Sequence, residues 1–285
     1  MASLERSIED FRSEGWVLVS QTDPLPELHL DVALLPSLMR DARSVFAVVD
    51  VLRASTSIVT LLERGVPSVI PAAGVEEARA LRKRLPGHLL CGEQDGLPPP
   101  GFDYGNSPAE FAAASLDGRP AILATSNGTR ILNDLADAPA VLVGALVNRE
   151  AAAGALLALA AEHGCNATIV CAASPARTGA RPGGGRSIAL EDALGAGAIA
   201  EAALRLDPSL QPTDAAIFAR DAFLAARAGL PAALVSARHG AELIAAGFSA
   251  DVEYCARLDA STTVPLLHRD GDGLLALRAL RNTAE

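Results

Sequence analysis

Hydrophobic positions along most of this chain follow two alternating patterns. From residue 45 onward, short apolar runs are followed by segments in which apolar residues recur every three or four positions. Short apolar runs are typical of buried strands, and the longer spacing is typical of helices that cover them. The predicted strands span residues 45–51, 66–71, 89–91, 121–124, 140–146, 167–172 and 251–258, and the predicted helices span residues 55–63, 74–85, 127–135, 148–163, 188–206, 214–228 and 236–246.

The first 44 residues lack a clean period. Residues 16–19 and 28–34 nevertheless have the composition of strands, with a turn at Asp23-Pro-Leu-Pro26 between them. We therefore predict an α/β fold, in which a largely parallel or mixed sheet is covered by helices in three layers and preceded by a short N-terminal β-rich segment. A length of 285 residues is compatible with one large domain or two smaller ones. We expect a single unit over residues 1–285, which the break near residues 150–165 could divide into two lobes.

The most informative stretch is Val48-Val-Asp-Val-Leu-Arg-Ala-Ser-Thr56. An apolar run meets Asp50, then Arg53, then the hydroxyls of Ser55 and Thr56 as a helical pattern begins. The unpaired backbone N–H groups of a helix start favour anions. This stretch therefore predicts a site that holds a metal and a phosphate together.

A second polar turn, Thr125-Ser-Asn-Gly-Thr-Arg130, follows another apolar run. Gly128 allows a tight turn, hydroxyl donors surround it, and Arg130 offers a planar fork suited to phosphate or sulfonate. The alternative is an ordinary N-cap on a surface helix. Ligands bind outside the carboxyl ends of parallel strands, so in a parallel sheet these turns would converge on one edge.

The loop from Gly92 to Pro108 is unusually rich in Gly, Pro, Asp and Asn. Glu93, Asp95 and Asp103 are hard oxygen ligands of the type that Mg²⁺ selects. The alternative is a rigid surface loop whose carboxylates face water.

Two further segments are candidates for the site. Glu191-Asp192 precedes an Ala-rich helix, where paired acids usually compensate the helix dipole. His239, in Ser236-Ala-Arg-His-Gly240, is the only histidine in a plausible motif. The five histidines are too dispersed to predict a zinc site.

Charge and composition exclude several functions. A net charge of −10 argues against nonspecific nucleic-acid binding, which needs a basic surface. The N-terminus has no signal pattern, and no apolar stretch is long enough to span a membrane. The four cysteines are scattered without a CxxC pair, which is typical of reduced thiols in a cytosol. We therefore expect a cytoplasmic protein that does not bind nucleic acid or membranes.

Several familiar catalytic plans are absent. Lys83 is the only lysine, and it lies in a basic run on a predicted helix face, so lysine-dependent mechanisms are not expected. The sequence has no GxSxG elbow, Walker A or HExxH motif. A dehalogenase-type phosphatase needs a second acid two residues after its nucleophilic aspartate, where this chain has Leu52. Asp50 therefore fits a metal ligand better than a nucleophile.

Segments distributed over residues 45–265 resemble one known family. The matching stretches are Val49-Asp-Val-Leu-Arg-Ala-Ser-Thr56, Gly92-Glu93, Gly101-Phe-Asp-Tyr-Gly-Asn-Ser-Pro108, Thr125-Ser-Asn-Gly-Thr129, Gly144-Ala-Leu146 with Asn148, Glu191-Asp192, Ser236, His239-Gly240, Gly247-Phe248, Asp251, Cys255 and Asp259. In this order they resemble the 2-phosphosulfolactate phosphatase family. The resemblance implies an α/β enzyme that uses Mg²⁺ to hydrolyse the phosphate ester of a 2-hydroxy acid carrying a sulfonate, on the route to coenzyme M. We also expect a homo-oligomer, with a dimer favoured.

The chain departs from the family pattern after the strand predicted at residues 167–172. The family often runs Cys-Ala-Gly there, whereas this chain has Cys171-Ala-Ala-Ser174 and then a longer loop, Pro175 to Arg186, with three arginines. If that loop borders the distal acid group of the substrate, the resemblance does not fix the preferred substrate.

The combined hypothesis is Mg²⁺-assisted phosphoryl transfer from a small anionic phosphoester to water. The catalytic residues would be Asp50, Arg53, Glu93 and His239, with His239 as general acid, and the metal would be held by some of Asp50, Glu93 and Asp103. The substrate-binding residues would be Ser55, Thr56, Asn106, Ser107, Thr125, Ser126, Asn127, Gly128, Thr129, Arg130 and Asn148.

Alternatives remain at this point. A covalent phospho-aspartate at Asp50 is the mechanistic rival, and phospholactate is a rival substrate. The chain could instead be a non-catalytic protein that binds small dianions. The polar loops could also be structural and form an oligomer interface.

Overall fold

The computed structural model describes residues 28–39, 43–125, 128–175 and 185–280. The strands are β1 (His29–Ala33), β2 (Val45–Val49), β3 (Val69–Ala72), β4 (Leu89–Gly92), β5 (Ala121–Ala124), β6 (Val141–Gly144), β7 (Ala167–Cys171), β8 (Ser174–Pro175), β9 (Arg186–Ser187), β10 (Gln211–Pro212), β11 (Pro265–Arg269) and β12 (Leu275–Ala279). The helices are α2 (Ala54–Glu63), α3 (Val75–Arg84), α4 (Pro108–Ala113), α5 (Gly128–Asp134), α6 (Arg149–His163), α7 (Leu190–Leu206), α8 (Asp214–Ala226), α9 (Leu230–Ser236), α10 (Arg238–Ala245) and α11 (Ser249–Cys255).

Ten strands form one mixed sheet, in the order β10-β1-β7-β2-β6-β11-β12-β3-β5-β4. The first five of these strands are parallel to one another and form a large block, and β3, β5 and β4 form a small parallel block. The antiparallel hairpin β11–β12 joins the two blocks. The predicted mixed sheet is confirmed.

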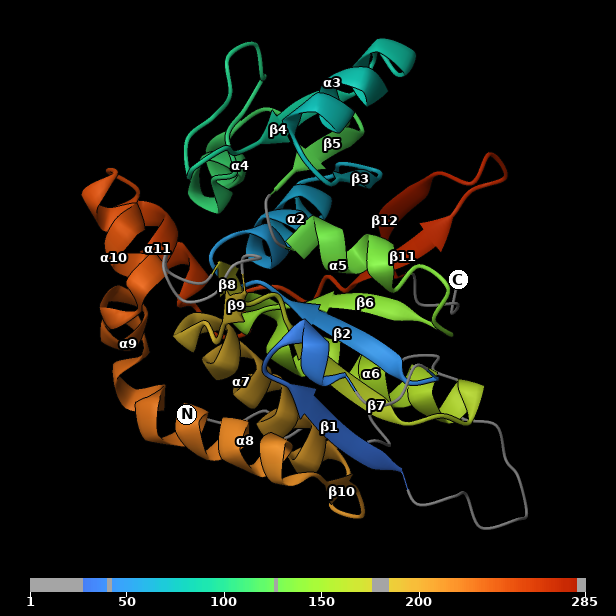
Figure 1. Ribbon diagram of the computed structural model, residues 1–285, viewed down its shortest axis with the longest axis vertical. Helices are drawn as coiled ribbons and strands as arrows, with labels where there is room; N and C mark the ends of the chain where they lie inside the picture. The colour runs from blue at the N-terminus through green and yellow to red at the C-terminus, as the bar shows by residue number, and fades with distance from the viewer. Residues whose placement is uncertain (1–27, 40–42, 126–127, 176–184, 281–285) are drawn as a thin grey trace.

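Helices cover both faces of the sheet, which gives the three predicted layers (Figure 1). Strand β2 shows why: Val45, Ala47 and Val49 pack on one side with α6, α7 and α8, while Phe46 and Val48 pack on the other with α2 and α5. Successive side chains of a strand point to opposite faces, so a continuous apolar run is buried on both. Among the described residues, no helix is long and apolar enough to cross a membrane.

Two predictions about the C-terminal part of the chain were wrong. Residues 251–258, predicted as a strand, lie mostly in α11, because the buried residues Asp251, Val252 and Cys255 follow helical spacing. The hairpin β11–β12 was missed, although two apolar runs flank the turn Asp270-Gly-Asp-Gly273 in the pattern of a hairpin. Of the two N-terminal strands, residues 28–34 contain β1, and residues 16–19 lie outside the described residues.

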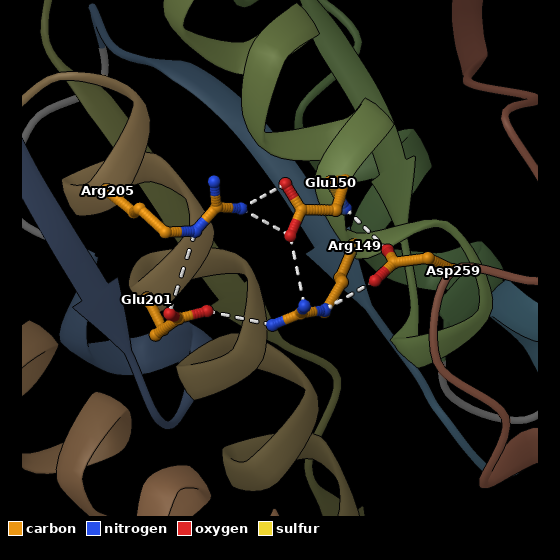
Figure 2. Close-up of polar contacts among 5 residues, drawn as sticks. All are labelled: Arg149, Glu150, Glu201, Arg205 and Asp259. Carbon is orange, nitrogen blue, oxygen red and sulfur yellow. Dashed lines mark hydrogen bonds and ion pairs between the residues drawn. The ribbon is translucent and has the colours of Figure 1, made fainter. Parts of the chain in front are cut away.

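Strands from both sides of residues 150–165 pair in the same sheet, since β7 lies between β1 and β2. Helix α6, which occupies this segment, is tied at its start to two other parts of the chain (Figure 2). Arg149 is buried and bonds to Asp259 at 2.7 Å, to Glu201 at 2.8 Å and to Glu150 at 3.0 Å. Arg205 pairs with Glu150 on the exposed side. This cluster fixes α6 to α7 and to the segment that precedes β11.

Candidate active site

The turn after β2 is held by its own hydroxyl groups. Ser55 Oγ accepts a hydrogen bond from the Asp50 N–H at 2.8 Å, and the Ser55 N–H donates to the Asp50 carbonyl at 2.9 Å. Thr56 Oγ1 donates to the Val51 carbonyl at 2.9 Å. The hydroxyls of Ser55 and Thr56, predicted to bind substrate, are thus engaged within the turn and fix its shape.

The Asp50 carboxylate lies at the start of two helices. It accepts hydrogen bonds from the N–H groups of Ala54 in α2 and Gly128 in α5. A Cβ atom at Gly128 would lie 2.8 Å from Asp50 Oδ2, so only glycine allows this approach. Burial is the largest effect on Asp50 and raises the pKa of its carboxyl, while the nearby His239 and the two N–H groups act to lower it. The anion expected at the start of α2 is therefore Asp50 itself.

The Arg53 side chain is fixed on three sides. Its guanidinium donates to Asp251 Oδ2 at 2.8 Å and to the Gly96 carbonyl at 2.8 Å, and it lies 4.5 Å from the centre of the Phe248 ring. Arg53 is 3% exposed and Asp251 is 1% exposed, so this is a buried ion pair. Ser107, predicted to bind substrate, donates instead to Asp251 Oδ1 at 2.5 Å. Asp251 thus links the starts of α2 and α4 to α11.

Two buried acids in the first turn of α7 face Asp50. Asp192 accepts the N–H groups of Val51 at 2.9 Å and Ala173 at 3.0 Å, which ties the ends of β2 and β7 together. Burial raises the pKa of Asp192 well above its ordinary value, and the neighbouring carboxylates of Asp50 and Glu191 raise it further. Burial also raises the pKa of Glu191, while the charges of His239 and Arg238 lower it. These two acids can compensate the dipole of α7, and they also interact with Asp50 at the site.

Helix α10 forms one wall of the site. Arg238, His239, Glu242, Leu243 and Ala246 lie along one side of it, and they line the same cavity as Asp50. His239 Nδ1 lies 3.2 Å from Glu242 Oε2, an interaction that orients the ring.

These elements enclose a cavity of about 410 Å³. The predicted residues that line it are Asp50, Arg53, Glu93, Asn106, Thr125 and His239. The other polar residues that line it are Asp95, Ser174, Glu191, Asp192, Arg238 and Glu242.

The turns that line the cavity follow strands of opposite direction, because the strands of the small block are antiparallel to those of the large block. Adjacent strands twist by roughly 20–25°, so the five steps from β2 to β5 add up to roughly 100–125°. This rotation brings the carboxyl ends of β4 and β5 toward that of β2. We expected the polar turns to converge on one edge of a parallel sheet. They converge instead through the twist of a mixed sheet.

The remaining predicted residues have other positions. Asp103 Oδ2 accepts the Leu90 N–H at 2.8 Å, outside the cavity. Thr129 Oγ1 donates to the Thr125 carbonyl at 2.9 Å, within the turn. Arg130 is exposed on α5 and does not line the cavity. Ser126 and Asn127 lie outside the described residues.

Asn148 has a structural environment. Its side chain accepts the Ala145 N–H at 2.8 Å and donates to the carbonyls of Val143 at 3.3 Å and Thr263 at 2.9 Å. It is fully buried, so its amide joins the end of β6 to the segment before β11.

Comparison with known proteins assigns the chain to a family. The family profile described as 2-phosphosulpholactate phosphatase matches residues 33–270. A protein of Deinococcus radiodurans named probable 2-phosphosulfolactate phosphatase is 39% identical over 251 residues, covering 87% of this chain and 92% of that protein. Proteins of the same name from Carboxydothermus hydrogenoformans and Thermus thermophilus are 35% and 34% identical, covering 89% and 88% of this chain and 99% and 100% of their own length. The chain belongs to the 2-phosphosulfolactate phosphatase family.

Proposed function

We propose that this protein is a phosphoric monoester hydrolase that releases phosphate from 2-phosphosulfolactate with the help of Mg²⁺. One observation carries the proposal: a preformed guanidinium, Arg53, lies in the same small cavity as Asp50 and Glu93. Family membership and the names of the relatives support the same substrate.

The charges of the cavity favour a cation. Among the described residues, six acidic side chains line it (Asp50, Glu93, Asp95, Glu191, Asp192 and Glu242), against two arginines and one histidine. A phosphoester dianion would be repelled by this surface unless a cation neutralised part of it.

The donor chemistry fits Mg²⁺ in particular. Carboxylate oxygens are the ligands that this ion prefers, and it usually takes only one or two of them, together with waters and substrate oxygens. In the described residues, no group of three His, Cys, Asp or Glu side chains is placed to hold a metal ion. We propose Asp50 and Glu93 as the ligands. A bound Mg²⁺ would polarise a phosphoryl oxygen and lower the pKa of water.

The chain's own groups would bind and orient the ester. Arg53 would hold the phosphoryl oxygens, because its ion pair with Asp251 fixes its direction before substrate arrives. Because Nδ1 of His239 contacts Glu242, its Nε2 would be the nitrogen that protonates the leaving alkoxide.

The direct test is phosphate release. Purified protein with Mg²⁺ is expected to release phosphate from 2-phosphosulfolactate, and EDTA is expected to stop the reaction until Mg²⁺ is restored. Tight binding of the ester without release of phosphate would instead identify a dianion-binding protein.

The same samples would test the proposed homodimer by their mass in solution. The proposed cytoplasmic location is supported by four free cysteines.

Asn106 supplies a second, independent sign that a ligand binds here. It is 4% exposed and lines the cavity, yet its Oδ1 accepts no hydrogen bond from the described chain. Its neighbours are both fixed, since Gly105 accepts the Gly92 N–H at 3.2 Å and Ser107 donates to Asp251. Buried polar atoms without a partner are rare in folded proteins. We infer that this amide binds a water or ligand group in the cavity that it lines.

Asn106→Leu is therefore expected to separate stability from activity. Removing an unpaired buried polar atom leaves the free energy of unfolding of the ligand-free protein unchanged or higher. Turnover is expected to fall by about 10²-fold, the usual loss for one polar group that acts on the transition state. Urea unfolding without ligand and steady-state kinetics measure the two effects.

Asn148→Leu is the matched comparison. It breaks three hydrogen bonds and leaves buried partners unpaired, so it is expected to lower the free energy of unfolding by about 3 kcal/mol. Equal destabilisation by both substitutions, with turnover by Asn106→Leu unaffected, would contradict the role of Asn106.

A further inference from the structure

Two of the described arginines line the cavity, and they differ in element and burial. Arg53 lies at the start of α2 and is 3% exposed, whereas Arg238 is the first residue of α10 and is exposed. Both line the cavity. The proposed substrate also carries negative charge in two places, on its phosphoryl group and on its carbon skeleton.

Arg53 is suited to the phosphoryl end. Its guanidinium is held by Asp251, the Gly96 carbonyl and the Phe248 ring, so it presents its remaining N–H groups in a fixed direction. It also lines the cavity with Asp50 and Glu93, the proposed metal ligands. Phosphoryl oxygens bound there would contact the metal and the guanidinium together.

One further described cation in the cavity is suited to the acid group on the carbon skeleton of the substrate. The ionised acids among the described lining residues would repel an acid group placed against them. Of the other described basic residues that line the cavity, His239 is proposed for proton transfer. Arg238 is the residue that remains.

The backbone of Arg238 is firmly placed. The preceding residue, Ala237, is buried and donates its N–H to the Ala233 carbonyl at 3.1 Å. A Cβ atom at Gly240 would lie 1.9 Å from the Leu234 carbonyl oxygen, so this glycine allows α10 to pack closely on α9. The charge of Arg238 also reaches the cavity, because it lowers the pKa of the buried Glu191.

We propose that Arg238 is a specificity-determining residue, whose guanidinium binds the acid group on the carbon skeleton of the substrate while the phosphoryl group lies toward Arg53. Planar, bidentate donors suit carboxylate and sulfonate oxygens. This inference rests on the proposed function for its substrate.

The test uses the two halves of the substrate as separate probes. Binding of sulfolactate and of inorganic phosphate is measured by calorimetry on the full chain with Mg²⁺, for wild type, Arg238→Gln and Arg238→Lys. Loss of a charged hydrogen bond is expected to weaken sulfolactate binding by Arg238→Gln about 10- to 100-fold. Phosphate binding is expected to stay within about 3-fold, and lysine to restore part of the sulfolactate affinity. Arg227→Gln, which removes an exposed charge away from the cavity, is the control.

Kinetics give a further readout. Arg238→Gln is expected to raise KM for 2-phosphosulfolactate with a smaller effect on kcat, as for an interaction made in the ground and transition states alike. Equal weakening of both probes, an unchanged sulfolactate affinity, or no sulfolactate binding by wild type would overturn the inference. If wild type bound both probes but released no phosphate, the proposed function would fail while the binding data still decided the role of Arg238.

Discussion

Replacing Asp50 with asparagine is expected to lower turnover of 2-phosphosulfolactate by about 10³-fold. A metal that polarises a phosphoryl oxygen contributes several kcal/mol to the transition state, and the variant would lose one of its two proposed ligands. The substitution keeps the size of the side chain, so the close packing of Gly128 against it is preserved. Steady-state phosphate release over a range of Mg²⁺ concentrations measures the effect, and wild-type turnover would contradict it.

The same variant has an expected signature in stability. Burial raises the pKa of Asp50 above its ordinary 3.8, so its favourable contribution is complete below that value and is lost as pH rises through the raised pKa. Asparagine does not titrate. Without metal, the free energy of unfolding of wild type relative to Asp50→Asn is therefore expected to fall as the pH rises above 3.8 and through the raised pKa. Urea unfolding in EDTA measures this difference, and a constant difference would contradict the raised pKa.

A further measurement separates the two mechanisms for Asp50. A covalent phospho-aspartate transfers phosphate to an added alcohol, whereas attack by water yields little such transfer. We expect wild type to form phosphate and almost no phosphorylated alcohol. Abundant transfer would make Asp50 the nucleophile.

Asp251→Asn is expected to destabilise the protein by about 3–5 kcal/mol and to reduce activity as well. The substitution leaves the buried Arg53 guanidinium without a counter-charge. It also weakens the acceptor of the Ser107 hydroxyl and the Ala109 N–H. Urea unfolding measures the first effect, and kinetics at a temperature where the variant is folded measures the second.

The double variant Arg53→Met/Asp251→Leu is the control for this ion pair. Replacing both charges with apolar groups removes the unpaired charge, so stability is expected to recover in part, while the Ser107 hydroxyl and the Ala109 N–H stay without their acceptor. Activity is expected to stay low, because the guanidinium that we propose to bind phosphate is gone. Recovery of activity in the double variant would show that Arg53 has only a structural role.

The local part of the site could be predicted from sequence. The turn after β2 was placed correctly because strand and helix patterns meet there within a few residues. The parallel strands and most helices follow from the same alternation. Gly128 was expected to allow a tight turn, and the structure adds that it lies against the Asp50 carboxylate.

The long-range part could not be predicted. Asp251 and Arg53 are 198 residues apart in the chain, and no local pattern relates them. The stretch from Asp251 to Cys255 alternates like a strand, and only its packing against α4 and α10 makes it a helix. The hydroxyls of Ser55, Thr56 and Ser107 look like ligand donors in sequence, yet the fold uses them internally.

The position of the hairpin β11–β12 has a consequence for biosynthesis. The small block is complete at residue 124 and can pair as it leaves the ribosome, and β2, β6 and β7 can pair soon afterwards. The backbone ladder that joins the two blocks needs residues 265–279, which are made later than both. The nascent chain therefore carries two finished half-sheets with unpaired edges, β6 and β3, until translation reaches the hairpin. Such edges can pair with other chains, so this interval is when the protein is most exposed to misassembly.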